Sequence, residues 1–401
     1  MLLIDLTHTS HTAANTGIQR QARGVFNALA QLTATAPVCL DPFAAAWRPL
    51  DALELQNARG KCPVGHSRGA QWTLGQKLRG WSGRLGRNTP VLPAGTGLVC
   101  PEIFSPAVAA RQPELFARCS GPRIAVFFDA IPLTHPELTP PKTVARFPSY
   151  LQELLRFDGV AAISQTSADY LTGYWRWLGV GHAPPVTVVP LGVDLSGIAP
   201  APTQPTVLPQ VLCVSSVEGR KNHLALLGAA ESLWAAGLRF ELRLIGLPRP
   251  ETASSALAEI ERLRSAGRPL RFDGVVDEPT LNAAWAACRF SVYPSEIEGF
   301  GLPIIESLAR GKPCICIATG ATGELVPGGG CLGVQPADAA NFASAMRRLL
   351  TEEALGQRLT EEARHRSVPT WEGCSQHLLA WMQQLPRRSD QEQRSGESGP
   401  A

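Results

Sequence analysis

Short apolar runs and amphipathic helical segments alternate along most of the chain. The first run, LLIDLT (residues 2–7), is typical of a strand, and from residue 18 apolar positions recur at helical spacing in IQRQARGVFNALAQL. Three further β-branched runs follow: RIAVFFDAIPL, VAAIS and VTVVPLG. Such runs are typical of parallel strands that are buried on both faces. The pattern predicts an N-terminal α/β domain.

The same alternation begins again after a segment without periodicity. Between residues 211 and 295 four strand-like runs alternate with three helical segments, which predicts a parallel, doubly wound sheet. The segment before it is rich in proline and alanine, as linkers often are. The last residues are polar and without pattern. We therefore predict an N-terminal domain over 1–194, a linker over 195–210, a C-terminal domain over 211–385 and a disordered tail over 386–401.

Length and composition agree with a globular protein of two domains. The chain has 401 residues, more than one core usually supports, with 44% hydrophobic and 18% charged residues. No apolar run reaches the roughly 20 residues of a membrane span, and the N-terminus lacks the basic start of a secretory signal. We expect a cytoplasmic protein. The ten cysteines lack the paired spacing of a zinc or redox site, so we interpret them as reduced core residues.

Basic residues concentrate in the first half of the chain. Residues 1–190 carry 17 Lys+Arg against 11 Asp+Glu, a net charge of +6. One basic cluster is interleaved with tryptophans and consists of Trp72, Lys77, Arg79, Trp81, Arg84 and Arg87. It fits contact with phosphorylated acceptors or with an anionic membrane surface. A solvated basic loop is the simpler alternative, and no nucleic-acid partner is expected.

The most informative segment, residues 291–313, reads SVYPSEIEGFGLPIIESLARGKP. The pattern predicts a strand that ends at Pro294, a glycine-containing loop, and a helix with Pro303 in its first turn and Gly311 at its end. Backbone amides and a helix N-terminus then lie at the carboxyl edge of the sheet, where phosphate groups bind in open α/β folds. We expect an anionic ligand there.

Two carboxylates, Glu298 and Glu306, flank this loop eight positions apart. Because a carboxylate accepts two hydrogen bonds from a vicinal diol, the pair would hold opposite ends of a nucleotide sugar whose diphosphate lies on the amides between them. In the alternative interpretation, Glu306 is an ordinary first-turn glutamate favoured by the helix dipole and Glu298 is a loop residue. The residues alone leave both interpretations open.

The segment 298–303, EGFGLP, followed by Glu306, resembles the EX7E signature of glycosyltransferase family 4. The resemblance implies GT-B architecture, with two Rossmann-like, doubly wound domains that face each other across a cleft. It implies that Glu298 contacts the donor sugar and that Glu306 binds the ribose hydroxyls. The amides of the loop would hold sugar and diphosphate, and they belong to Gly299, Phe300, Gly301 and Leu302.

A second segment, VSSVEGRKN (residues 214–222), is similar to the family's strand-to-helix turn that ends in Arg-Lys. Lys221 matches the lysine that neutralises the donor diphosphate, with Arg220 beside it, so both are expected to stabilise charge on the leaving group. The segment departs from the family at two positions. Ser215 stands where glycine is common, and Gly219 stands where proline is common.

In the first domain, NTGIQR (residues 15–20) is similar to the TGIxR loop that opens many members of the family. There Gly17 would let the backbone approach the donor phosphate and the acceptor, and Arg20 would lie on the acceptor side. Alternatively, Gly17 is a turn residue and Arg20 a solvated helix residue.

The segment VFFDAIPLTHPE (residues 126–137) resembles a strand end that carries a histidine before an aspartate in many family members. Here Phe128 occupies the histidine position, Asp129 is retained, and His135 follows six residues later. Whether Asp129, His135 or neither replaces that histidine in catalysis is open.

The resemblance implies a retaining, mannosyltransferase- or rhamnosyltransferase-like enzyme. It would transfer a hexose or deoxyhexose from a nucleoside diphosphate sugar to a glycan or lipid-linked acceptor in cell-envelope polysaccharide or O-antigen assembly. No metal or cofactor is expected, because the departing phosphate can accept the acceptor's proton. Peripheral contact with the inner face of the membrane is compatible with this setting.

Other classes of enzyme fit the sequence less well. A nicotinamide dehydrogenase needs GxGxxG directly after a strand, and a P-loop enzyme needs Ser or Thr where Pro313 follows Gly311-Lys312; neither pattern occurs. A sugar-nucleotide epimerase of the same architecture and a non-catalytic sugar-nucleotide-binding subunit stay open.

Overall fold

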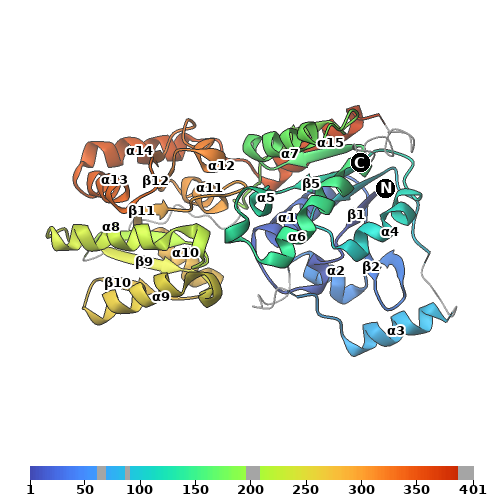
Figure 1. Cartoon of the computed structure of the whole chain (residues 1–401), viewed down its shortest axis with the longest axis horizontal. Coiled ribbons are helices and arrows are strands. Elements are labelled where there is room, and N and C mark those ends of the chain that lie inside the picture. Colours follow the sequence, from blue (N-terminus) through green and yellow to red (C-terminus); the bar gives the residue numbers. More distant parts are fainter. Residues whose placement is uncertain (61–68, 86–90, 196–207, 387–401) are drawn as a thin grey trace. The chain divides into compact units, whose positions relative to one another are not determined.

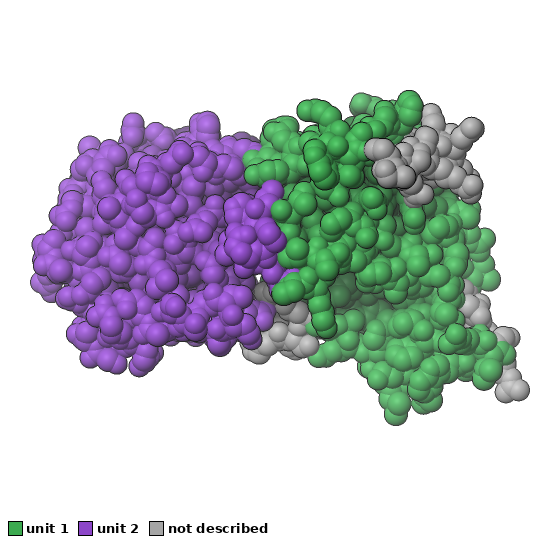
Figure 2. All heavy atoms as spheres, in the orientation of Figure 1, with its two compact units in different colours: residues 1–133, 141–194, 369–401 green, residues 134–140, 195–368 purple. Residues whose placement is uncertain are grey.

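The chain folds into two compact units, coloured separately in Figure 2. The computed structural model describes residues 1–60, 69–85, 91–195 and 208–386. The first unit comprises residues 1–133, 141–194 and 369 onward, and the second comprises residues 134–140 and 195–368. Each is described by itself, and the predicted cleft between them stays a prediction.

The first unit is built on a seven-stranded sheet (Figure 1). Its strands are β1 (Leu2–Asp5), β2 (Thr35–Asp41), β3 (Ala46–Pro49), β4 (Gly97–Cys100), β5 (Arg123–Phe127), β6 (Gly159–Ala162) and β7 (Val186–Val188). Their order in the sheet is β3-β2-β1-β4-β5-β6-β7, and all neighbours are parallel except β2 and β3. The strand-forming runs predicted in this domain are therefore confirmed as parallel strands, which are buried in β1, β5 and β6 and half-buried in β7.

Helices connect these strands as the sequence pattern predicts. They are α1 (Gly17–Leu32), α2 (Ala52–Ala58), α3 (Leu74–Arg84), α4 (Pro106–Phe116), α5 (Ile131–Thr134), α6 (Pro141–Glu153) and α7 (Gln165–Trp177), with short 3-10 turns η1 (Thr9–His11), η2 (Pro136–Leu138) and η3 (Leu154–Arg156). In α1 the buried residues Ala22, Val25, Phe26 and Leu29 recur at the spacing of one helix face. The core of the unit includes the fully buried Trp175 and Phe127.

The second unit is built on six parallel strands. They are β8 (Gln210–Val214), β9 (Glu241–Ile245), β10 (Leu270–Phe272), β11 (Cys288–Tyr293), β12 (Cys314–Ile317) and β13 (Cys331–Val334). The order is β10-β9-β8-β11-β12-β13, which is the 3-2-1-4-5-6 order of the Rossmann fold. The predicted doubly wound domain is confirmed.

Helices alternate with these strands along the chain (Figure 1). They are α8 (His223–Ala235), α9 (Pro250–Ser265), α10 (Glu278–Ala287), α11 (Leu302–Ala309), α12 (Gly320–Gly323), α13 (Ala339–Thr351) and α14 (Glu353–His365), with the turn η4 (Gly219–Lys221). Helices α8 and α13 pack on each other over a core that includes Phe290 and Phe342. β8 begins at Gln210, so the predicted linker of 195–210 lies mostly outside the described residues, as does the predicted tail of 386–401.

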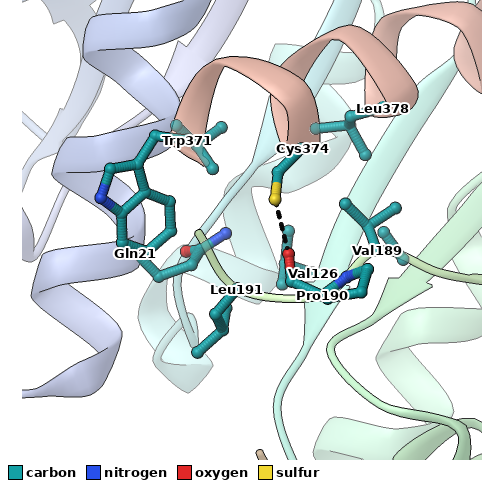
Figure 3. A pocket seen from close by; sticks show the side chains of 10 residues that line it. Gln21, Val126, Val189, Pro190, Leu191, Trp371, Cys374 and Leu378 are labelled. Carbon is teal, nitrogen blue, oxygen red and sulfur yellow. Dashed lines mark hydrogen bonds between the residues drawn. The ribbon is translucent and has the colours of Figure 1, made fainter. Parts of the chain in front are cut away.

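The last helix, α15 (Trp371–Gln384), belongs to the first unit and not to the predicted C-terminal domain of 211–385. Trp371 lies so close to α1 that a Cβ on Gly24 would be 2.3 Å from its ring. Figure 3 shows the same helix over residues 189–191, where the Cys374 thiol donates to the Pro190 carbonyl at 2.9 Å. Helical periodicity alone cannot reveal this return, because it shows which face is buried but not against which unit.

Two expectations from composition can be compared with the described residues. Nine cysteines fall within them, and all nine are buried and unbridged, as the interpretation as reduced core residues predicts. Across the described ranges no helix combines the length and the apolar character that crossing a bilayer requires.

Candidate functional site

The strand order of the second sheet locates its binding edge. Successive strands build outward to one side from β8 and then to the other side from β11, so the topological switch point lies between these two neighbours. Ligands of open parallel sheets bind at the carboxyl ends of the strands beside this point. The loops that follow β8 and β11 contain Arg220, Lys221 and Glu298, which are the predicted donor-binding residues.

Arg220 and Lys221 converge on one carboxylate. Arg220 Nη1 donates to Glu298 Oε1 at 2.7 Å, and Lys221 Nζ donates to the same oxygen. Arg220 Nη2 also contacts Glu218 Oε1 at 2.9 Å. The main chain joins the loops as well, because the Glu296 amide donates to the Arg220 carbonyl at 2.9 Å. The structure thus brings together three of the residues that the sequence analysis proposed.

Two residues that the sequence analysis did not single out complete this cluster. Lys221 Nζ donates to Tyr293 Oη at 2.7 Å, and Ser295 Oγ donates to Glu298 Oε1 at 2.5 Å. Both residues flank Pro294 at the carboxyl end of β11, beside the switch point. That position was the signal available in the sequence.

Burial and opposite charges set the protonation of the cluster. Lys221 is 6% exposed, and burial lowers the pKa of its ammonium although Glu298 opposes the shift. Burial raises the pKa of the Glu298 carboxyl, but Lys221 and Arg220 outweigh burial and bring it down to about 2. Glu298 is therefore ionised at neutral pH. Any other anion that reaches this point competes with Glu298 for both cations.

A glycine turn leads from this cluster into α11. Gly301 precedes the helix with φ of 115°, a conformation that side chains rarely adopt, and a Cβ there would lie 2.9 Å from Ile304 Cδ1. Its neighbours Phe300 and Leu302 are buried. Glu306 is the fifth residue of α11 and only 7% exposed, which is unusual for a carboxylate. The loop and the helix lie as predicted, whereas the ligand roles of Gly299, Phe300, Gly301, Leu302 and Glu306 stay predictions.

In the loop after β8, local contacts accommodate Ser215, which stands where glycine is common in the family. Ser215 Oγ lies 3.3 Å from His223 Nε2, and burial lowers the pKa of His223 to about 4, so the imidazole is neutral at neutral pH. The next loop packs tightly on this one. Gly246 has φ of 156°, and a Cβ there would lie 1.8 Å from the Ser215 carbonyl oxygen. The backbone of the Ser215 loop is therefore fixed by contact with the end of β9.

In the first unit the predicted strand, loop and helix are present around residues 15–20. Gly17 is the first residue of α1 and is exposed, while the preceding Thr16 is extended and its hydroxyl donates to Gln19 Oε1. Arg20 lies in the first turn of α1. The ligand roles of Gly17 and Arg20 stay predictions.

The strand-end segment after β5 separates its three candidate residues. The Phe128 side chain is buried, 5% exposed, and packs as a core residue. Asp129 Oδ1 accepts a hydrogen bond from the Ile131 amide at 3.0 Å, which shapes the turn into α5. His135 Nδ1 lies 2.9 Å from Thr134 Oγ1, in the short segment that groups with the second unit. A catalytic role for Asp129 or His135 stays open.

Two buried carboxylates that the sequence analysis did not single out hold the loop after β1. Glu102 accepts the backbone amides of His8 at 2.5 Å and Thr9 at 2.9 Å, and Asp5 accepts the Thr7 amide at 3.0 Å. Burial and the nearby Glu102 raise the pKa of Asp5 to about 7. Burial also raises the pKa of Glu102. Because β1 and β4 adjoin at the switch point of the first sheet, this clamp fixes the loop that leads to α1.

One further group in the first unit has donor atoms close enough to hold a metal ion: His11, Cys39 and Glu54. Its donors are already engaged. Arg48 donates to both Glu54 oxygens at 2.7 Å, and His11 Nε2 lies 2.8 Å from Glu54 Oε1. Burial raises the pKa of the Cys39 thiol, which keeps it protonated. A cation would have to displace the Arg48 guanidinium, so the group fits a buried ion-pair network better than a metal site.

Comparison with known proteins identifies the family to which the sequence of the second unit is similar. Residues 208–352 match the sequence profile of a family described as "Glycosyl transferases group 1". The second unit carries a group 1 glycosyltransferase domain. This glycosyltransferase domain contains β8 to β13 and therefore the whole cluster around Glu298. The predicted glycosyltransferase relationship is confirmed, whereas the retaining stereochemistry and the roles of Glu298 and Glu306 stay predictions.

Individual relatives extend the similarity beyond this domain. The chain is 25% identical over 335 residues to the serotype-specific mannosyltransferase WbdA of Escherichia coli, a match that covers 78% of this chain and 38% of WbdA. It is 29% identical over 170 residues to the O-antigen chain mannosyltransferase B of Escherichia coli, which covers 42% of this chain and 44% of that protein. The chain thus spans less than half the length of these curated relatives.

A solved structure shows that the similarity includes the fold of both units. The Anabaena protein HepE, in complex with UDP-glucose, superposes with a TM-score of 0.65 at 17% sequence identity, covering 96% of this chain and 99% of HepE. The chain has the fold of the GT-B glycosyltransferases, as predicted.

Proposed function

We propose that the chain is a retaining glycosyltransferase that moves a hexose or deoxyhexose from a nucleoside diphosphate sugar to a glycan or lipid-linked acceptor in cell-envelope polysaccharide or O-antigen assembly. The observation that carries the proposal is the convergence of Arg220 and Lys221 at the switch point of a glycosyltransferase domain. Two mannosyltransferase relatives support a mannose-like donor and a polysaccharide setting. The HepE complex supports a nucleoside diphosphate sugar as donor.

The charge at the cluster suits a diphosphate leaving group. Arg220 and Lys221 supply two cations at the carboxyl edge of the sheet, and the glycine turn before α11 supplies amides at a helix N-terminus. Glu298 pairs with both cations. On donor binding the diphosphate would take over Arg220 and Lys221, which would release Glu298 to accept hydrogen bonds from the sugar hydroxyls.

The proposed reaction balances without a metal or a cofactor. The bond between the anomeric carbon and the β-phosphate oxygen breaks, and the acceptor oxygen forms a new bond on the same face of the sugar. The acceptor's proton passes to the departing phosphate, and the nucleoside diphosphate leaves. Arg220 and Lys221 stabilise the negative charge that develops on the leaving oxygen, which is electrostatic catalysis directed at the transition state.

A panel of nucleoside diphosphate hexoses and deoxyhexoses tests the proposal. We expect thermal stabilisation by at least one of them, and transfer to a glycan or lipid-linked acceptor that resists EDTA and yields the donor's anomeric configuration by NMR. Lys221→Met should lower turnover by about a hundredfold or more, whereas Arg347→Met, an exposed position on α13, should not. Unchanged turnover of the Lys221 variant would contradict the role given to the cluster.

The same panel separates the alternatives. A sugar-nucleotide epimerase would convert the nucleotide sugar to its epimer without an acceptor. It would form no glycosylated product. A non-catalytic binding subunit would be stabilised by a donor but would neither hydrolyse nor transfer it. Peripheral location at the inner face of the membrane is part of the proposal and is tested separately by cell fractionation.

A further inference from the structure

Helix α3 presents a row of large apolar side chains to solvent. The row consists of Leu74, Leu78 and Trp81 of the helix and of Leu85, its C-cap, which are 70%, 53%, 50% and 81% exposed. They are spaced at i, i+4, i+7 and i+11, so at about 100° per residue they fall within an arc of about 60°. A stripe of this kind on a surface helix usually faces a core, whereas this one faces away from its own unit.

The helix is anchored through its opposite side, which fixes the direction of the stripe. Gln76 is buried and donates to Glu54 Oε1 at 3.0 Å and to Asp51 Oδ2 at 3.2 Å. One turn later, Gly80 lies so close to the body of the unit that a Cβ there would be 2.6 Å from Phe43 Cβ. A capping box between Thr73 and Gln76 starts the helix. The apolar row is therefore held outward by a specific anchor.

The charges beside this row are all of one sign. Within α3 the ionisable residues are Lys77, Arg79 and Arg84, and the helix contains no acidic residue. Arg79 pairs with Asp51 at 2.5 Å while its side chain stays 65% exposed, and Lys77 Nζ lies 5.8 Å from the Phe43 ring. Most of the basic cluster named in the sequence analysis therefore lies on a helix and not in the loop given as the simpler alternative, and Arg87 lies outside the described residues.

We propose that α3 docks the protein on an anionic lipid bilayer. The helix would lie in the plane of the surface, with Leu74, Leu78, Trp81 and Leu85 at the boundary of headgroups and acyl chains. Lys77 and Arg84 lie along one side of the apolar row and would contact anionic headgroups. Large apolar residues with Trp on one face and cations beside them are the composition of helices that bind membrane interfaces. The inference rests on the membrane location included in the proposed function, but its residues are separate from the cluster around Glu298, so its failure would leave the proposed transfer reaction standing.

Cosedimentation of the full chain with vesicles tests the proposal. The unaltered protein should bind vesicles of phosphatidylcholine with one third phosphatidylglycerol about tenfold or more tightly than vesicles of phosphatidylcholine alone, and high salt should remove the difference. Leu78→Ser with Leu85→Ser should weaken binding to both by about tenfold or more, because burying one large apolar side chain changes an equilibrium by about that factor. Lys77→Gln with Arg84→Gln should remove the preference for the anionic vesicles.

Matched variants separate docking from general stickiness. Trp177→Ala removes a tryptophan that is more exposed than Trp81, 78% against 50%, and lies on α7; it should leave vesicle binding unchanged, whereas Trp81→Phe should keep most of it. The proposal is overturned if the unaltered chain ignores anionic vesicles or if the double Ser variant, still folded by circular dichroism, binds them equally well. Light scattering that shows a dimer in the unaltered chain and a monomer in the double Ser variant, without vesicle binding, would instead assign the face to a second copy.

Discussion

At the residue scale, Glu298 pairs with the two cations to which the proposed donor diphosphate would bind. Its Oε1 atom accepts from Arg220, Lys221 and Ser295 together. A carboxylate held this way neutralises the buried Lys221 and the half-buried Arg220. The same interaction opposes the binding of any anion, so the residue has two effects of opposite sign on the donor complex.

The two effects can be separated by Glu298→Gln. We expect the variant to bind the free nucleoside diphosphate about fivefold more tightly, about 1 kcal/mol, because the competing charge is gone. Transfer should nevertheless fall, because the amide replaces a carboxylate that would bind the sugar hydroxyls. Calorimetric titration and turnover measure the two quantities. Glu218→Gln is the control, since the Glu218 carboxylate pairs with Arg220 at 2.9 Å; equal changes in both variants would refute the special place of Glu298.

Asp5 predicts a pH dependence of the first unit. Its pKa is raised from 3.8 to about 7 by burial and by Glu102, so between these values the folded state holds a proton that the unfolded state has lost. Stability should therefore fall as pH rises from about 4 to about 7 and change little above that. Asp5→Asn keeps the acceptor for Thr7 and removes the titration. Across this range the unaltered protein should lose about 4 kcal/mol more of its unfolding free energy than the variant, as measured by calorimetry, and an equal loss in both proteins would contradict the assignment.

At the element scale, the sequence predicted what depends on local pattern and missed what depends on packing. Four parallel strands of the second unit, β8 to β11, were predictable because short apolar runs alternate there with helical segments. Helix α3 is not among the predicted elements, since its residues enter the sequence analysis only as a basic cluster with a solvated loop as the simpler alternative. Gly80 is present for close packing on Phe43, which a single sequence does not reveal. The sequence analysis also missed Tyr293 and Ser295. Their contacts with Lys221 and Glu298 form only where two loops meet in the fold.

The contact between the loops after β8 and β9 gives a prediction at the element scale. Gly246→Ala would place a Cβ 1.8 Å from the Ser215 carbonyl oxygen in a backbone conformation that is already strained for alanine. We expect a loss of about 3 kcal/mol or more in the second unit. Gly237→Ala is the matched control, with φ of 83° and nothing within 4 Å, and should cost about 1 kcal/mol. Chemical denaturation compares the two, and equal losses would show that the loops separate freely.

At the scale of the whole molecule, the chain changes unit four times. Residues 134–140 form a short excursion into the second unit, and the chain later leaves the first unit after Asp194 and returns after Val368. The segments at this last departure and return pair with each other, because the Val193 amide donates to the Pro369 carbonyl at 3.0 Å. Helix α15 then packs on the first sheet. Gly97 makes room for the Met382 side chain of this helix, because a Cβ on residue 97 would lie 2.3 Å from Met382 Cε. The first unit is therefore completed only by the end of the chain.

Truncation after Val368 should consequently damage the first unit and spare the glycosyltransferase domain. Removing α15 exposes the apolar surface under Trp371, Leu378 and Met382, and at about 1.5 kcal/mol or more per large buried side chain the loss is comparable to the stability of a domain. Hydrogen exchange should show lost protection in β4, β6 and α1, while β8 to β13 and nucleotide binding persist. Truncation after Leu385 keeps α15 and serves as the control. If the shorter chain kept its protection in α1 and β4, the return of α15 would be an accessory contact, and the first unit would fold from residues 1–194 alone.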